Sequence, residues 1–98
     1  MTAQTATDLR AVRAHLVEHG WTQGRAHDEA GRCCLVGAAT RAMGDVVSYR
    51  YGAVRSALFM ALRGVDFDLS AWNDAPGRTF AEVLALLDAA IANEEGRP

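Results

Sequence analysis

Three residues with different chemistry stand side by side at Trp72-Asn73-Asp74, directly before an Ala-Pro-Gly turn sequence at 75–77. An amide and a carboxylate held beside an indole could bind a ligand through hydrogen bonds. The same residues suit a structural role, because Asn or Asp can begin an Asx-turn and Trp can fill the edge of a core. We favour the structural role and keep all three as candidate binding residues.

The two cysteines, Cys33 and Cys34, are adjacent and are expected at the start of a helix, where the pKa of a thiol falls. Together with His27 and with Asn73 or Asp74 they could supply a nucleophile, a base and an orienting group. A cysteine before an apolar run is more often a small buried hydrophobe. We therefore name no catalytic residue and keep both cysteines as candidate reactive thiols. Adjacent cysteines rarely bridge each other, so we expect a reducing, cytosolic compartment.

His15 and His19 have the i, i+4 spacing that places two imidazoles on one side of a helix, as zinc sites require. The further ligands within reach in the sequence are His27, Asp28, Cys33 and Cys34. The HExxH and CxxC spacings are missing, however, and His19 near a helix end is also explained by the helix dipole. We expect no metal and no other cofactor.

The charges are unevenly distributed along a chain whose net charge is -2. The segment 32–63 holds many arginines and few acids, whereas 64–98 is acidic. Arg50 and Arg55 lie near the start of a predicted helix and could contact nucleic acid in the manner of a helix-turn-helix. A chain without net positive charge is unlike most autonomous DNA-binding domains. The alternative is that these arginines pair with acids of the last helix or of the 66–74 loop.

The apolar spacing predicts the helices that must position these residues. Leu9, Val12 and Leu16 form a stripe for a helix from a Thr7 cap to about His19, with residues 1–6 frayed and Gly20 as its end. The segment 33–43 is apolar all round, which is typical of a buried helix, and Gly37 with Ala38 would let another helix approach closely.

Two more helices follow. A stripe of Val54, Leu58 and Leu62 predicts a helix over 49–63. Thr79 and Glu82 match the capping box that begins a helix. The residues of this last helix expected to face inward are Phe80, Val83, Leu84, Leu87, Ala90 and Ile91.

The sequence therefore predicts an all-α fold, a compact four-helix single domain over 1–98 with ordered loops at 20–32 and 64–78. Half of the residues are hydrophobic, which argues against disorder. No apolar run approaches the roughly 20 residues that span a bilayer, so we expect no membrane contact. Long links in compact domains are often functional.

Three stretches, HGWTQG, DEAGRCCLVGA and WNDAPGRTFAEVLALLDAAI, resemble a family of small proteins of unassigned function from actinobacteria and their phages. The resemblance extends from His19 to Ile91. The recurring features of the family fall on Gly20, Trp21, Gly24, Cys34, Gly37, Ala38, Trp72, Asn73, Asp74 and Thr79. The resemblance implies a fold and a host range but no mechanism.

The function that we expect is that of a small cytosolic, non-enzymatic interaction module, derived from a phage or prophage and acting on a host protein. Aromatic side chains and arginines dominate binding hot spots. The expected anchors are the exposed parts of Trp21, Tyr49, Tyr51 and Trp72. The helix at 49–63 could alternatively form a homodimer. The alternative functions are a nucleic-acid-binding regulator that uses Arg50 and Arg55, and a thiol- or metal-dependent enzyme.

Overall fold

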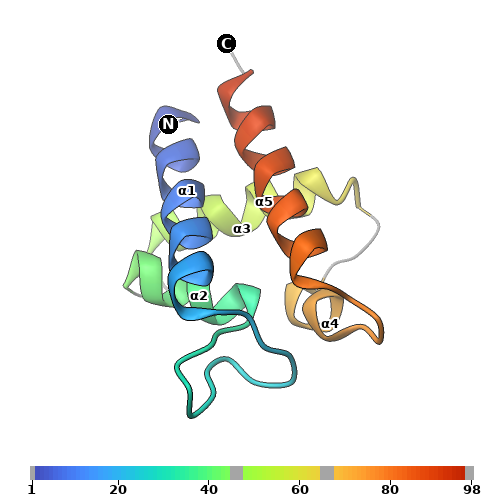
Figure 1. Ribbon diagram of the computed structural model, residues 1–98. Helices are drawn as coiled ribbons and strands as arrows, with labels where there is room; N and C mark the ends of the chain where they lie inside the picture. The colour runs from blue at the N-terminus through green and yellow to red at the C-terminus, as the bar shows by residue number, and fades with distance from the viewer. Residues whose placement is uncertain (1, 45–47, 65–67, 97–98) are drawn as a thin grey trace.

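Two long helices lie antiparallel and side by side in the computed structural model, which describes residues 2–44, 48–64 and 68–96. They are α1 (Thr2–His19) and α5 (Phe80–Glu95), and α3 (Tyr49–Ala61) crosses behind both of them (Figure 1). The shorter α2 (Leu35–Met43) and α4 (Leu69–Asp74) lie at the end where α1 finishes and α5 begins. The predicted all-α fold is confirmed, and no strand occurs among the described residues.

The core forms where α1, α3 and α5 meet. Leu9, Val12 and Leu16 are fully buried, which confirms the predicted stripe of α1. Gly20 and Gly44 follow α1 and α2 with φ values of 94° and 83°, so both helices end in the left-handed conformation that glycine adopts most easily. None of the described helices is long and apolar enough to cross a membrane.

The inward face of α5 differs in part from the prediction. Val83, Leu87, Ala90 and Ile91 are buried as expected, but Phe80 and Leu84 are only half-buried. Leu86 is buried instead. Because α5 packs against both α1 and α3, its buried face is wide and is turned toward Leu86.

The first helix begins earlier than predicted. α1 starts at Thr2, and the Thr7 hydroxyl donates to the Ala3 carbonyl at 3.0 Å within the helix, so Thr7 is not the cap. Residues 2–6 are helical rather than frayed. Burial of Thr5 and Ala6, at 6% and 3% exposure, explains the extra turns, because packing stabilises a helix more than its intrinsic propensity does.

The predicted 64–78 loop contains a helix. Asp68 caps α4 by accepting a hydrogen bond from the Ala71 N–H at 3.1 Å. α4 carries Trp72, Asn73 and Asp74 in its last turn, whereas residues 65–67 lie outside the described part of the chain. A helix of six residues is too short for helical periodicity to appear in a sequence.

Candidate functional site

Asn73 lies at the centre of a buried network that joins α4 to the 20–32 loop. Its side chain is 0% exposed. Its Oδ1 accepts hydrogen bonds from Trp21 Nε1 at 2.7 Å and from the Leu35 N–H at 3.0 Å. Both of these groups can only donate, so the amide oxygen must face them. The first N–H of α2 thereby obtains a partner.

The nitrogen of the same amide is also saturated. Asn73 Nδ2 donates to the Thr22 carbonyl at 3.2 Å and to Asp74 Oδ1 at 2.9 Å. A primary amide has two hydrogens and two lone pairs, and Asn73 uses all four. A ligand could bind Asn73 only by replacing one of these bonds.

The neighbours of Asn73 extend the network over the surface. Asp74 Oδ1 accepts from the Gly24 N–H at 2.9 Å. Gln23 Nε2 donates to the carbonyls of Asn73 and Ala75, at 2.9 and 3.1 Å. We call these connections between residues 21–24, Leu35 and residues 73–75 the Asn73 clamp. The clamp replaces the expected Asx-turn into residues 75–77, because the partners of Asn73 lie in the 20–32 loop and α2.

The two indoles flank the Asn73 clamp. Trp72 is 8% exposed, and the Arg78 guanidinium lies 4.0 Å from the centre of its ring. Trp21 is half-buried and stacks on Phe80, with ring centres 6.2 Å apart. Sequence reasoning missed Gln23, Arg78 and Phe80, since only the fold brings them here. That Trp21, Trp72, Asn73 and Asp74 bind a partner stays a prediction.

Gly37 is where the 20–32 loop contacts α2 most closely. A Cβ at this position would lie 2.2 Å from the Ala26 carbonyl oxygen. The Ala26 carbonyl also accepts the Cys34 N–H at 3.1 Å. The small residue at 37 therefore admits the backbone of a loop, and not the second helix that the sequence suggested.

Cys33 lies between two imidazoles under the 20–32 loop. Its Sγ is 3.3 Å from His27 Nδ1 and 3.5 Å from His15 Nε2. A thiol in contact with an imidazole is what the enzyme alternative required. However, Cys33 is 1% exposed, and burial raises the pKa of its thiol. A substrate could reach this neutral thiol only if the loop moved.

Cys34 has a different role, because it is the N-cap of α2. Its Sγ accepts the Gly37 N–H at 3.2 Å, and the side chain is 6% exposed. The helix thus begins at Leu35, two residues later than predicted. Asn73 and Asp74, the alternative orienting groups of a catalytic arrangement, both take part in the Asn73 clamp.

The histidines gather without forming a ligand set. The rings of His15 and His19 lie 4.3 Å apart. Burial, and then the positive charges of His19 and Arg41, lower the pKa of His15. Within the ranges 2–44, 48–64 and 68–96, no three side chains of His, Cys, Asp or Glu are arranged to hold a metal ion.

Arg50 is paired with an acid of the first helix. Its Nη2 and Nε lie 2.6 and 3.0 Å from the two carboxylate oxygens of Asp8, which is 2% exposed. The hydrogen bonds from Arg50 are the main reason that the pKa of Asp8 is lowered. Arg50 therefore pairs with an acid of α1, and not with the last helix or the 66–74 loop, where the sequence placed the acidic partners. Arg55 lies over the Phe59 ring, 4.6 Å from its centre.

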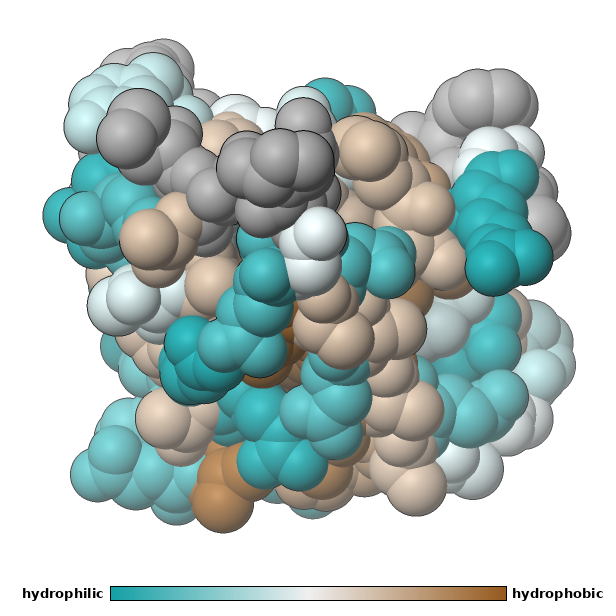
Figure 2. Space-filling model, turned by 90° about the horizontal axis from the view of Figure 1, so that it is seen from above, coloured by the Kyte–Doolittle hydropathy of each residue, from teal (hydrophilic) through white to brown (hydrophobic). Residues whose placement is uncertain are grey.

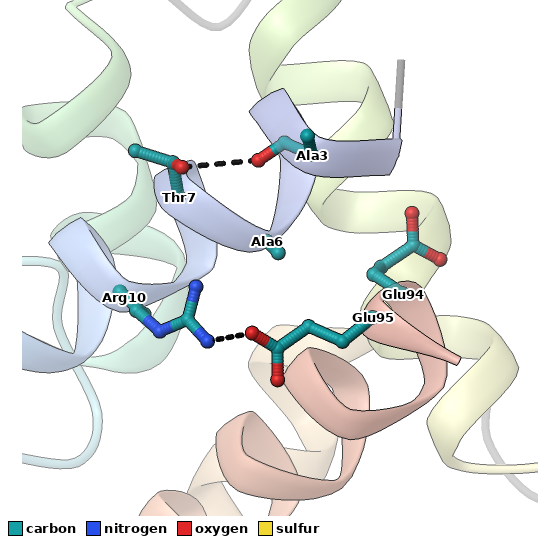
Figure 3. Close-up of a pocket in the computed structure, with 6 residues that line it drawn as sticks. All are labelled: Ala3, Ala6, Thr7, Arg10, Glu94 and Glu95. Atoms are coloured by element: carbon teal, nitrogen blue, oxygen red, sulfur yellow. Dashed lines mark hydrogen bonds and ion pairs between the residues drawn. The ribbon is translucent and has the colours of Figure 1, made fainter. Parts of the chain in front are cut away.

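A cleft of about 430 Å³ separates the N-terminal end of α1 from the C-terminal end of α5. Arg10 crosses it to pair with Glu95, above a floor that includes Ala3 and Ala6 (Figure 3). Seen from above, polar and weakly apolar residues are interspersed on this end of the molecule, and strongly hydrophobic residues show only in small areas (Figure 2). Several of the polar groups that line the cleft are already engaged within the chain, because Thr7 donates to the Ala3 carbonyl and Arg10 pairs with Glu95.

The side of α3 that faces away from the core has a different composition. Tyr49 and Met60 are 82% and 58% exposed, and they share one side of the helix. We call this side, with the small residues between them, the α3 outer face. Its residues are Tyr49, Gly52, Ala53, Ser56 and Met60. It carries no charged side chain, although a helix face in contact with water is usually charged or polar.

The chain matches one family model over residues 1–93, that of a family of unknown function (DUF6197). The chain therefore belongs to this family. Neither the curated proteins nor the solved structures contain a significant match. The family supplies no activity, so the function must be argued from the geometry.

Proposed function

We propose that this member of the DUF6197 family is a cytosolic, non-enzymatic protein-binding module whose contact surface is the α3 outer face. One observation carries the proposal: Tyr49 exposes 82% of its surface on a helix face without charge. Tyrosine supplies a large, rigid and amphipathic contact area, and it is enriched in binding hot spots. The anchor is thus Tyr49, since Trp72 is buried and Trp21 is half-buried.

The charged residues on other faces support this choice of surface, because many of them are paired within the chain. Arg13 Nε lies 2.8 Å from Asp88 Oδ1, and Arg10 pairs with Glu95. These pairs join α1 to α5. A partner that used them would have to break existing ion pairs, whereas the α3 outer face can be covered without that cost.

The same contacts favour protein binding over the two alternatives. A nucleic-acid interface on α3 would need Arg50, which is committed to Asp8, and Arg55, which lies on Phe59. A thiol enzyme would need access to Cys33, which is 1% exposed. The resemblance to actinobacterial and phage proteins favours a host protein as the partner.

Affinity capture from a lysate of the source cells tests the proposal. Tyr49→Ala should lose a protein that the wild type retains. Val17→Ala is the matched control, because Val17 is 57% exposed on α1, outside the α3 outer face. Its capture should equal that of the wild type. The same proteins captured by wild type, control and Tyr49→Ala would show that the α3 outer face is not the contact surface.

A further inference from the structure

We propose that the α3 outer face binds a second copy of this chain, in an antiparallel twofold arrangement that seats Met60 of each copy beside Tyr49 of the other. This inference rests on the proposed function, because it takes the α3 outer face as a contact surface. The second copy would occupy that face in place of the host protein, so the two would compete for it. Three features of α3 support this arrangement: a cavity at one end, a protruding side chain at the other end, and small residues between them.

The cavity lies where the beginning of α3 meets α1. Its volume is about 150 Å³. The residues that line it are Gln4, Thr5, Asp8, Tyr49, Arg50 and Ala53. The charges in its wall already balance each other, because Arg50 and Asp8 form a two-point ion pair. An uncharged side chain can therefore fill the cavity and contact the Tyr49 ring and Ala53 without leaving a charge unpaired.

The protruding side chain is Met60, about three helical turns beyond Tyr49 on the same side of α3. Methionine is flexible and polarizable, fits irregular hollows, and makes favourable contacts between its sulfur and aromatic rings. At 58% exposure it leaves much apolar surface in water. The Tyr49 ring and Ala53 offer Met60 apolar contacts at the edge of a cavity whose other lining residues are polar or charged.

The middle of α3 allows two helices to come close. Gly52 and Ser56 are exposed and small, and a Cβ at Gly52 would meet no atom within 4 Å. No charged side chain lies on the face itself, and of the arginines that border it Arg50 is paired with Asp8. Two copies of α3 can therefore approach along it without bulky side chains between them.

The arrangement of the three features identifies the occupant as a second copy. A twofold interface needs a surface that is complementary to itself when reversed. Reversal of α3 places Met60 of one copy opposite the Tyr49 cavity of the other, at both ends at once. A helix of 13 residues is roughly 20 Å long and gives a small interface, so the dimer should be weak and reversible.

Sedimentation equilibrium over a concentration series, up to about 1 mM, tests this directly. The mean mass of the wild type should rise toward that of a dimer with concentration. Met60→Glu should remain monomeric, because the interface would bury an unpaired charge. Val17→Glu, which adds the same charge elsewhere on the surface, should behave as the wild type. Met60→Ser, which adds no charge, should weaken the dimer less than Met60→Glu.

The geometry makes a second, more specific demand. Ser56 lies near the proposed twofold axis, so Ser56→Cys should form a disulfide between two copies upon mild oxidation, and wild type should not. A wild type that is monomeric at every concentration, or dimers that Met60→Glu leaves intact, would overturn the inference. If such a monomer still loses a captured protein upon Tyr49→Ala, the proposed function stands and only the occupant is wrong.

Discussion

The Asn73 clamp and the α3 outer face use polar chemistry in opposite ways. The clamp contains an amide with all four hydrogen-bonding positions filled, the Trp21 indole, and a carboxylate that accepts a backbone N–H. The α3 outer face has an exposed Tyr49 and Met60 with small residues between them, and it carries no charge. The Asn73 clamp has the more varied polar groups, but most of them already bind within the chain and are not available to a partner.

Residues that could bind a ligand must therefore be judged by the hydrogen-bonding groups and surface that the fold leaves unsatisfied. Asn73 is a candidate binding residue in the sequence because amides bind ligands. In the fold it holds three segments together, namely α4, the 20–32 loop and the start of α2. Tyr49 is one of four aromatic anchors expected from the sequence, which does not set it apart from the other three. In the fold it is among the most exposed of the large apolar side chains.

Removal of the amide should have the largest effect. Asn73→Ala leaves Trp21 Nε1 and the Leu35 N–H without an acceptor in a buried place. Each unsatisfied buried donor costs about 1–3 kcal/mol, so the free energy of unfolding should fall by about 2–6 kcal/mol. Urea denaturation measures this change.

An exposed amide serves as the control for this prediction. Asn93→Ala, on the surface of α5, should change the free energy of unfolding by less than about 0.5 kcal/mol. If Asn73→Ala were as stable as Asn93→Ala and lost a partner, the Asn73 clamp would be a binding site and the comparison would fail.

Gly37→Ala should have the next largest effect. The new Cβ would lie 2.2 Å from the Ala26 carbonyl oxygen, so the 20–32 loop must move away from α2. Overpacking of this kind costs about 1–3 kcal/mol. Thermal unfolding followed by circular dichroism measures the loss.

Gly52, a second glycine within a helix, provides a comparison, because its substitution should change the stability in the opposite direction. Gly52 has no atom within 4 Å of its would-be Cβ, so Gly52→Ala should stabilise the protein by about 0.4–1 kcal/mol. If both substitutions stabilised the protein, the close approach of the loop to α2 would be incorrect.

Loss of the α5 cap should have a smaller effect. Thr79 Oγ1 accepts the Glu82 N–H at 3.2 Å, and Glu82 Oε1 accepts the Thr79 N–H at 2.9 Å. Thr79→Ala removes one of these bonds and should cost about 1 kcal/mol. Thr79→Ser keeps the acceptor and should cost less in the same urea titration. Equal losses for the two variants would argue against the cap.

Lowering the pH should have the smallest effect on the free energy of unfolding among these four changes. Burial lowers the pKa of His15 from its usual 6.5, so the folded state disfavours the protonated ring. The stability that the neutral ring contributes is fully present above pH 6.5 and declines as the pH falls below it. His15→Gln should weaken this decline between pH 7 and pH 5, measured by urea denaturation. An unchanged pH dependence in His15→Gln would assign the loss to other groups.

Parts of this fold could be predicted from residues close in the chain. The stripe of Leu9, Val12 and Leu16 and the capping box at Thr79 depend on spacings of three or four residues, which a sequence displays directly. Gly44 ends α2 for an equally local reason. The burial of Leu86 in place of Leu84 could not be predicted from the sequence, because it depends on how α5 packs against α1 and α3.

The candidate site depended on distant residues and was harder to predict. Three of the four side-chain partners of Asn73 lie in residues 21–35, and no local pattern connects them to α4. The exposure of Tyr49 was equally hidden, since helical spacing shows which residues share a face but not which face the other helices cover. The contact between Cys33 and two histidines also arises only when the 20–32 loop folds over α1.

The most direct test of the central claim compares the two regions within one experiment. A photoreactive amino acid placed at Ser56 on the α3 outer face, or at Ser70 on the exposed side of α4 near the Asn73 clamp, reports what lies against each surface in source cells. Our account predicts crosslinked products from position 56 and none from position 70. Products from position 70 alone would contradict it and would make the region around Trp72, Asn73 and Asp74 the binding surface.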